Sequence, residues 1–263
     1  MSDPLRVERR GSIALLTIDR PERRNALDIP AMRQLKEKVQ SLHLDPEIRA
    51  VILTGAGEAF SAGGDVATMG EFLDRGELPR LFHELTAEME QVIREIVTMP
   101  KPVVAAIPGV AAGGGLSLAL ACDWRIASER ALLVPAFSRL GAVPDGGLTY
   151  FLPHYLGIGG AQALLFADAR VPAARALELS LVHEVVPADQ LTARAWERAH
   201  ELATGPTRAW AWVKRLTVSA FGQSLESQLA LERKGAVEAA QGPELAEGIR
   251  AFREKRPPRF EGA

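Results

Sequence analysis

The segment KPVVAAIPGVAAGGGLSLALACDWRIAS, residues 101–128, decides the fold. It holds an apolar, β-branched run at Val103–Ile107, a Pro-Gly turn, a glycine triplet and an apolar stretch at Leu116–Ala121. A second short apolar run follows at Trp124–Ala127. Short apolar runs bounded by Pro and Gly are typical of buried strands, and strands that alternate with helices favour parallel sheets. The segment therefore predicts a strand, a glycine-rich turn, a helix and a further strand.

The same segment is uncharged over the 21 residues Pro102–Cys122, which is long enough for a membrane span. Pro108 and the glycine triplet interrupt it, so a buried strand, turn and helix is the better interpretation. Because the chain is 47% hydrophobic and 24% charged, with a formal net charge of −2, it is expected to be globular and soluble, without a basic surface for nucleic acid. No membrane partner is expected.

Cysteine and histidine usage narrows the chemistry further. Cys122 is the single cysteine, so no intrachain disulfide can form, and the charged start of the chain is not followed by an apolar secretory segment. A reducing, cytoplasmic compartment is therefore expected. The five histidines are too far apart for a local metal motif, so no metal site is predicted.

Outward from residues 101–128, strand-like and helix-like stretches alternate, which predicts an α/β fold. Further strands are expected at Ser12–Ile18, Ala50–Leu53 and Ala131–Val134, and helices at Ile29–Leu42, Pro79–Thr98, Ala161–Phe166 and Ala173–Leu179. Beyond Pro187 only helical patterns are found, at Leu191–Ala203, Thr207–Ala220 and Ser224–Ala240. We therefore expect a core over residues 1–199 and a helical region over residues 200–263.

Three familiar signatures are incomplete or absent in this sequence. The stretch GAGEAF at residues 55–60 begins like a dinucleotide-binding loop, but Phe60 stands where a third glycine must let the helix approach. Ser117 lies outside any GxSxG turn, so no serine nucleophile is presented, and a GxxxxGK[ST] phosphate loop is missing from the sequence. Dinucleotide binding and serine hydrolysis are both disfavoured.

Two glycine-rich turns carry the strongest chemical signal. FSAGGD at residues 60–65 and GVAAGGGL at residues 109–116 each follow a predicted strand, and the second opens a helix. Small residues let a ligand reach main-chain N–H groups, and the first N–H groups of a helix favour negative charge. The two turns are either an oxyanion hole built from main chain or simply tight turns.

Further short motifs accompany these turns, over essentially residues 5–260. They are DRP at 19–21 with NAL at 25–27, KPVVAAI at 101–107, CD at 122–123, GAVPDGG at 141–147 and FREKR at 252–256. In order and spacing the whole set resembles the crotonase (enoyl-CoA hydratase/isomerase) superfamily. The resemblance implies a spiral of ββα repeats, a C-terminal helical trimerisation region over residues 200–263, and a homotrimer or a dimer of trimers. It also implies acyl-CoA thioester substrates and no cofactor beyond the coenzyme A of the substrate.

The resemblance assigns roles residue by residue. The N–H groups of Gly64 and Gly114 would hold the thioester enolate. Contacts to the substrate are implied for Arg24, Ala26, Ala62, Asp65, Phe137, Phe252 and Lys255, the last two within one subunit or across a subunit boundary. Where family members often carry a lysine for a CoA phosphate, this chain has Ala67.

The catalytic acids depart from the hydratase pattern. Hydratases of the family carry two glutamates that activate water, and the corresponding positions here are Ser117 and Phe137. Asp145 is the carboxylate that remains, at a place where isomerase-like members resemble this chain and shuttle a proton between carbons. Apolar surroundings at Phe137 would raise the pKa of a nearby carboxylate. The alternative is that Asp145 only caps a helix that starts near Gly147.

An enzyme that shifts a double bond through Asp145 is therefore the leading hypothesis. Hydration through Asp145 is one alternative, and a reaction similar to that of aryl-CoA dehalogenases is another, although those enzymes have histidine where this chain has Glu90. Glu90 is either a second proton carrier or a residue on the solvated side of its helix with no role in the reaction. A third alternative, from a different class, is an oligomer that binds acyl-CoA without useful turnover.

Overall fold

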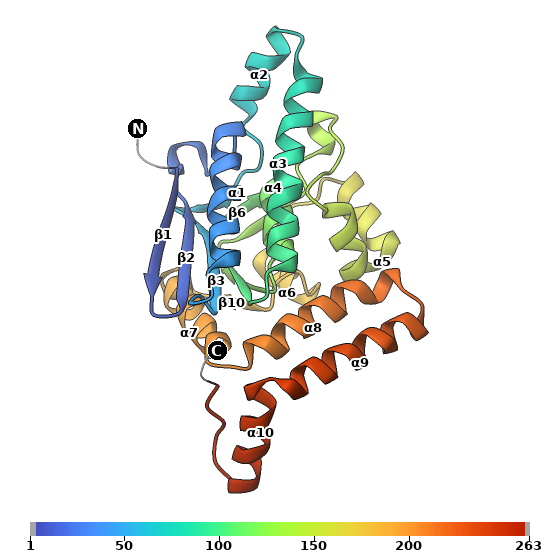
Figure 1. Cartoon of the computed structure of the whole chain (residues 1–263). Helices are drawn as coiled ribbons and strands as arrows, with labels where there is room; N and C mark the ends of the chain where they lie inside the picture. The colour runs from blue at the N-terminus through green and yellow to red at the C-terminus, as the bar shows by residue number, and fades with distance from the viewer. Residues whose placement is uncertain (1–3, 261–263) are drawn as a thin grey trace.

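The computed structural model of the chain describes residues 4–260, and within them the fold is α/β (Figure 1). Strands form a six-stranded sheet and a four-stranded sheet. The larger sheet has the order β1 (Leu5–Arg10), β2 (Ile13–Ile18), β3 (Ala50–Gly55), β5 (Val103–Ile107), β7 (Trp124–Ser128) and β10 (Glu184–Val186). The smaller sheet has the order β4 (Ala59–Ser61), β6 (Val110–Ala112), β8 (Leu132–Val134) and β9 (Val171–Pro172).

From β3 to β8 the chain alternates between the two sheets, so that each turn of the fold adds one strand to each sheet and then helical structure, whereas β1 and β2 both belong to the larger sheet. Strands β3, β5 and β7 pair in parallel in the larger sheet, and β4, β6 and β8 pair in parallel in the smaller one. The helices that close these turns are α2 (Val66–Asp74), α3 (Leu78–Thr98), α4 (Gly114–Ala121) and α5 (Leu148–Phe166). This arrangement is a spiral of ββα repeats.

Helices cover both faces of the larger sheet. Alternate residues of β3 point to opposite faces: Val51 and Leu53 belong to one apolar cluster, and Ala50 and Ile52 to the other. The first cluster includes the buried faces of α1 (Ile29–Leu44) and α3, which pack against each other. The second includes α7 (Leu191–Ala203). Strands buried on both faces read as continuous apolar runs, which explains why β5 is apolar throughout.

Up to residue 260, three helices follow α7 without an intervening strand: α8 (Thr207–Ser219), α9 (Leu225–Gln241) and α10 (Pro243–Glu254). They extend below the sheets in Figure 1. Helix α8 is anchored by Lys214, whose Nζ donates to Asp123 Oδ2 at 2.7 Å and to Ile96 O at 2.6 Å. The boundary between a core and a helical region near residue 200 stays a prediction.

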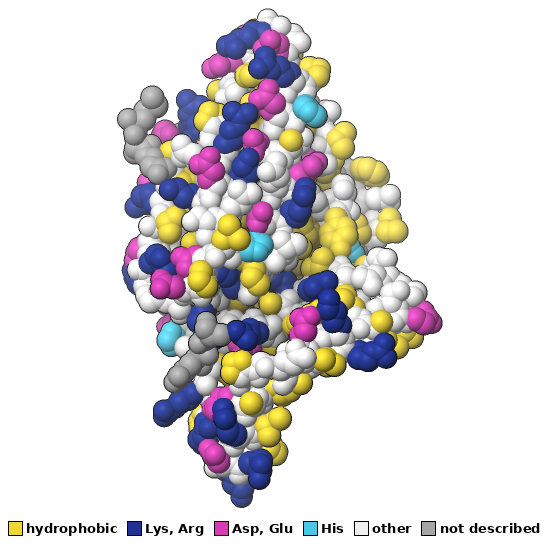
Figure 2. All heavy atoms as spheres, viewed as in Figure 1, with side chains coloured by type: hydrophobic (Ala, Val, Ile, Leu, Met, Phe, Trp, Pro, Cys, Tyr) yellow, Lys and Arg dark blue, Asp and Glu magenta, His cyan; other side chains and the backbone are white. Residues whose placement is uncertain are grey.

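The C-terminal helices and the segment that joins α8 to α9 expose large hydrophobic side chains. They are Trp210, Val213, Val218, Phe221, Leu225, Leu229, Val237, Leu245, Ile249 and Phe252. Figure 2 shows hydrophobic side chains along α9 and over α5, where Ile158 is 71% exposed. Exposed apolar side chains gathered on one surface are typical of regions that contact another molecule.

We expect the protein to self-associate through this surface, because apolar side chains on α8–α10 gain free energy when a second copy removes them from water. Light scattering at micromolar concentration measures the mass directly. A mass close to the 28.4 kDa of one chain would contradict the expectation.

The structure also contains helices and strands that the sequence patterns do not predict. Helix α5 begins at Leu148, which agrees with the helix start expected near Gly147, and it continues without a break in assignment through the separately expected helix Ala161–Phe166, although Gly157 interrupts it with φ +67° and ψ 167°. Strand β1, helices α2 and α10, and the short strands β4, β6, β9 and β10 were not expected. The expected helix at Ala173–Leu179 is found as α6 (Ala173–Glu178). Within residues 4–260, no helix is both long enough and apolar enough to cross a membrane.

Candidate active site

The two glycine-rich turns lie against each other. A Cβ atom added to Gly63 would stand 2.7 Å from Ala112 O and 3.0 Å from Gly114 N, which is closer than real side chains approach main chain. Gly63 also has φ +83°, a conformation that favours glycine. Glycine at this position therefore lets the turn after β4 touch the turn after β6.

The N–H of Gly64 points away from the chain segment that supports it. Gly64 forms an isolated parallel bridge with Leu27. The bridge uses the neighbours of Gly64: Leu27 N–H donates to Gly63 O at 2.7 Å, and the Asp65 N–H donates to Leu27 O at 3.2 Å. Because main-chain groups alternate in direction along an extended segment, the N–H of Gly64 faces the other way. No acceptor for it is found among residues 4–260.

Gly114 supplies a second N–H. It is the first residue of α4, after the N-cap Gly113, so its N–H has no acceptor inside the helix. No side chain caps this helix end. The partial positive charge of a helix N-terminus favours an anionic oxygen, and the paired N–H groups of Gly64 and Gly114 suit such an oxygen.

Buried polar side chains hold the glycine-rich turn after β4 in place. Asn25 is fully buried, and its Nδ2 donates to Ala59 O at 2.7 Å and to Ala56 O at 2.9 Å. The hydroxyl of Ser61 donates to Asn25 O at 2.8 Å and accepts from Gly63 N–H at 3.1 Å. The turn that carries Gly64 is therefore fixed before a ligand arrives.

Asp145 lies in the loop before α5, with its carboxylate beside Gly114. A Cβ atom added to Gly114 would stand 4.0 Å from Asp145 Oδ1. The N-cap of α5 is Gly147, and no side chain bonds to this helix end. The alternative that Asp145 caps the helix is therefore wrong. Within the described part of the chain, the carboxylate has neither a hydrogen-bond donor nor an ion-pair partner.

Burial raises the pKa of Asp145 to about 6, because partial removal from water penalises the charged form. Apolar groups border this place: a Cβ atom on Gly114 would be 2.6 Å from the methyl group of Met89, and one on Gly113 would be 3.9 Å from the Phe137 ring. A carboxylate with this pKa is ionised at neutral pH and is a stronger base than an ordinary aspartate.

Two methionines at the site were not predicted. The methyl group of Met89, on α3, lies at Gly114, and that of Met69, on α2, would stand 2.6 Å from a Cβ atom on Gly64. Met89 belongs to the apolar face of α3, which periodicity reveals, but the contact with Gly114 depends on how α3 packs. Glu90, the next residue, is exposed, so the solvated interpretation of Glu90 fits its position.

The residues assigned to the substrate cleft gather partly around Gly64. Ala62 N–H donates to Arg24 O at 2.9 Å, so Arg24, Ala26 and Ala62 lie close to the first turn. The Asp65 carboxylate is already engaged: it accepts from Ala67 N–H at 3.0 Å, which caps α2, and from Arg23 Nη1 at 2.7 Å.

Asp65 is ionised in this setting. Burial alone would raise the pKa of Asp65, but the hydrogen bonds from Arg23 and from the α2 amides outweigh it and hold the pKa below the usual range. Ala67 is exposed and offers no side-chain donor to a phosphate.

The structure does not bring Phe252 and Lys255 to the glycine turns of the same chain. Phe252 is 85% exposed on α10, and Lys255 ends that helix with φ +54°. Figure 1 shows α10 at the opposite end of the molecule from α2, which follows Gly64 and Asp65 directly. A substrate contact by these residues therefore stays a prediction, and it requires another subunit.

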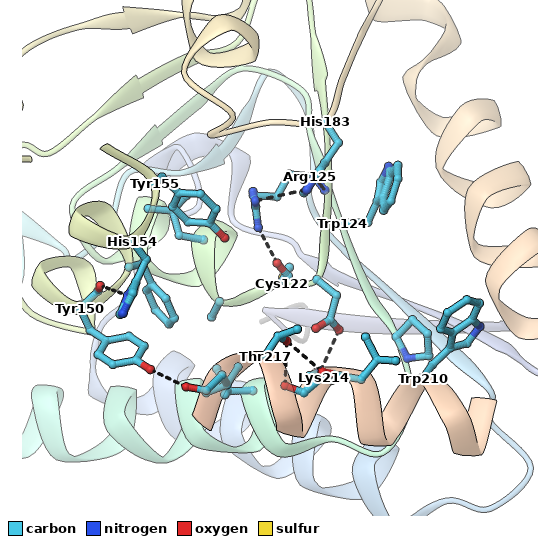
Figure 3. A pocket seen from close by; sticks show the side chains of 18 of the residues that line it. Cys122, Trp124, Arg125, Tyr150, His154, Tyr155, His183, Trp210, Lys214 and Thr217 are labelled. Carbon is cyan, nitrogen blue, oxygen red and sulfur yellow. Dashed lines mark hydrogen bonds and ion pairs between the residues drawn. The ribbon is translucent and has the colours of Figure 1, made fainter. Parts of the chain in front are cut away.

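A separate cavity of about 550 Å³ lies at the other end of α4, between α5, β7 and α8 (Figure 3). Several of its polar groups are already bonded: Lys214 to Asp123, Arg125 Nη1 to Cys122 O at 2.7 Å, and Tyr150 Oη to Val218 O at 3.0 Å. Burial raises the pKa of the Cys122 thiol to about 12, so it is no nucleophile at neutral pH. The glycine turns are therefore the better candidate for chemistry.

The arrangement at the glycine turns therefore combines two main-chain donors with one desolvated carboxylate. Within residues 4–260, no group of three or more His, Cys, Asp or Glu side chains is placed to hold a metal ion. Two N–H groups can stabilise an oxyanion, and the carboxylate beside them can take a proton from a carbon next to that oxyanion.

Comparison with known proteins gives a consistent result. The model of the family described as enoyl-CoA hydratase/isomerase matches residues 8–263. A probable enoyl-CoA hydratase of Rhodobacter capsulatus is 38% identical over 262 residues, 98% of each chain. The 1,2-epoxyphenylacetyl-CoA isomerase of Escherichia coli is 37% identical over 251 residues, 95% of each chain. Among solved structures, an enoyl-CoA hydratase from Polaromonas sp. JS666 has a TM-score of 0.92 at 35% identity, covering 98% of this chain and 99% of that one.

The spiral of ββα repeats, with glycine turns at the ends of its strands, is the crotonase fold, as predicted. The chain belongs to the enoyl-CoA hydratase/isomerase family within the crotonase superfamily, and it is an enzyme of that family. An acyl-CoA thioester substrate is consistent with this membership.

Proposed function

We propose that the protein is an acyl-CoA isomerase that moves a carbon–carbon double bond by proton transfer through Asp145. The observation that carries this proposal is the solitary, desolvated carboxylate of Asp145 beside the free N–H of Gly114. A shift of a double bond needs one group that both removes and returns a proton, and one carboxylate is sufficient for that. In this proposal, coenzyme A enters only as part of the substrate.

The proposed reaction starts with the thioester carbonyl of a 3-enoyl-CoA between the N–H groups of Gly64 and Gly114. Ionised Asp145 removes a proton from the α-carbon, and the electron pair of that C–H bond moves onto the thioester oxygen as a dienolate. The two N–H groups stabilise this negative charge as it forms. Protonated Asp145 then returns the proton to the γ-carbon, which gives the 2-enoyl-CoA and regenerates the carboxylate.

Hydration is the second candidate, and the observation in its favour is that several relatives are named enoyl-CoA hydratases. Hydration needs a group that activates water in addition to one that protonates carbon. At the two positions where hydratases carry glutamates, this chain has the buried residues Ser117 and Phe137. Neither side chain is a base at neutral pH, which supports isomerisation over hydration.

An assay of the purified protein with 3-enoyl-CoA and 2-enoyl-CoA esters tests the proposal. Interconversion of the two esters without a 3-hydroxyacyl product is the expected result. Formation of the 3-hydroxyacyl ester would favour the second candidate. Tight binding of the esters without turnover of either would contradict both, and would point to the acyl-CoA-binding oligomer.

The rate of isomerisation is expected to rise with pH and to reach half its maximum near pH 6. The reason is that only ionised Asp145 can accept a proton, and burial raises the pKa of Asp145 to about 6. A profile of kcat/KM between pH 4.5 and 8 measures this group in the free enzyme. A midpoint near 4 would show a carboxylate that water reaches freely, against the desolvation described above.

A further inference from the structure

One hydrogen bond ties the loop of Asp145 to the helix that carries Gly114. The hydroxyl of Ser117 donates to the main-chain carbonyl oxygen of Asp145 at 2.9 Å. Ser117 is fully buried and lies three residues after Gly114, on the first turn of α4. Residues three apart share one face of a helix, so the hydroxyl and the oxyanion donor belong to the same rigid unit.

The loop also packs closely on Ser117. A Cβ atom added to Gly146 would stand 2.8 Å from Ser117 Cβ, 3.1 Å from its Oγ and 3.3 Å from Met89 Cγ. Gly146 has φ +58°, so the chain turns there in a conformation that favours glycine. The peptide that follows Asp145 is therefore pressed onto α4 with no space for a side chain between them.

The carboxylate of Asp145 has no comparable support of its own. Among residues 4–260, no donor bonds to either of its oxygens. The direction of the side chain therefore depends on where the main chain of Asp145 is held, and the side-chain bond that holds it comes from Ser117.

We propose that Ser117 is a positioning residue, which fixes Asp145 relative to the N–H of Gly114 by its bond to the Asp145 carbonyl. The inference rests on the proposed isomerase function. In the proposed reaction the Gly114 N–H holds the enolate oxygen and the Asp145 carboxylate moves the proton. Ser117 therefore sets the distance between this N–H and this carboxylate. A misplacement of about 1 Å in such a pair lowers a rate about 100-fold.

Replacing Ser117 with alanine removes the bond and leaves the main-chain donors in place. We expect kcat of Ser117→Ala to fall at least about 10-fold, whereas the Kd of an unreactive acyl-CoA changes less than about 2-fold. The midpoint of the kcat/KM profile is expected to move to lower pH, because a released loop lets water reach the carboxylate. Ser117→Cys keeps the shape with a weaker donor, and is expected to fall between the parent and Ser117→Ala.

Ser128 provides a matched control, because it is also fully buried and its hydroxyl donates to a main-chain carbonyl, that of Pro108, at 2.6 Å. Ser128→Ala is expected to lower the melting temperature without changing kcat or the pH midpoint. Parent-like kcat in Ser117→Ala, or the same loss in both alanine variants, would overturn the proposal. If Ser117→Ala does not fold, Ser117→Cys decides by the same comparison. A parent enzyme that does not isomerise would instead refute the proposed function.

Discussion

Asp145→Asn is expected to lower kcat about 100-fold or more, the usual contribution of a general base. Asparagine keeps the size of the side chain but cannot accept the proton. The Kd of an unreactive acyl-CoA is expected to stay close to that of the parent, because the donors at Gly64 and Gly114 are main-chain groups. Steady-state kinetics with a 3-enoyl-CoA, together with a binding titration, measure both quantities.

The same variant is expected to be as stable as the parent at pH 7.5, or more stable. The pKa of Asp145 is about 6 in the folded protein and 3.8 for an ordinary aspartate, so the folded state binds the proton more tightly. Stability contributed by this group is therefore highest below pH 4 and falls as the pH rises through 6, by on the order of 3 kcal/mol. Asparagine avoids that cost, so thermal unfolding at pH 4 and pH 7.5 tests the sign.

Glu90→Gln is the matched control for the loss of an acid, because Glu90 is exposed on α3 next to Met89. It is expected to retain full turnover. If Asp145→Asn instead keeps its turnover while Glu90→Gln loses it, the proton is carried by Glu90 and the assignment of Asp145 is wrong.

Gly114→Pro is expected to lower kcat about 100-fold or more, because proline removes one of the two donors to the oxyanion. Proline is tolerated at the first position of a helix, and Gly114 is the first residue of α4, so the helix itself can accept the change. The melting temperature and the oligomeric mass, measured beside kcat, establish that the variant is folded.

Gly114→Ala separates the loss of the donor from the addition of bulk. Alanine places a Cβ atom 2.6 Å from the Met89 methyl group, as proline does, but it keeps the N–H. The methyl group is the end of a flexible side chain and can shift. A folded Gly114→Pro variant with a kcat equal to that of Gly114→Ala would exclude the N–H of Gly114 from the oxyanion hole.

The central groups of the candidate site can be read from the sequence because each lies within a short motif that follows a strand. Gly64 and Gly114 can be found because they belong to glycine-rich turns, and Asp145 because two glycines follow it directly in the sequence. Met89 carries no such mark. It is one of several apolar residues on α3, and only packing against α4 brings it to Gly114, whereas Glu90, about 100° further around the helix, faces solvent.

The parts of the fold that the sequence does not predict have physical reasons. Strand β1 has only Leu5 buried, so its sequence lacks the alternation that reveals a half-buried strand. Strand β9 has two residues, Val171–Pro172, and is too short to show any period. In α5, Pro153 and Gly157 obscure the helical pattern, although the chain accommodates both.

The proposed donors Gly64 and Gly114 lie in the turns that directly follow β4 and β6, which end at Ser61 and Ala112 and are parallel neighbours in the smaller sheet. Neighbouring strands are about 4.8 Å apart, and an oxygen held at about 2.9 Å by two amides fits between donors at such a spacing. The spacing of the two proposed donors therefore depends on the pairing of β4 and β6, together with the buried Asn25 and Ser61 that hold the turn after β4. Substitutions on α2 and α3, which carry Met69 and Met89, can therefore change the apolar surroundings of Gly64 and Gly114 while the pairing of β4 and β6 keeps the two glycines at the same spacing.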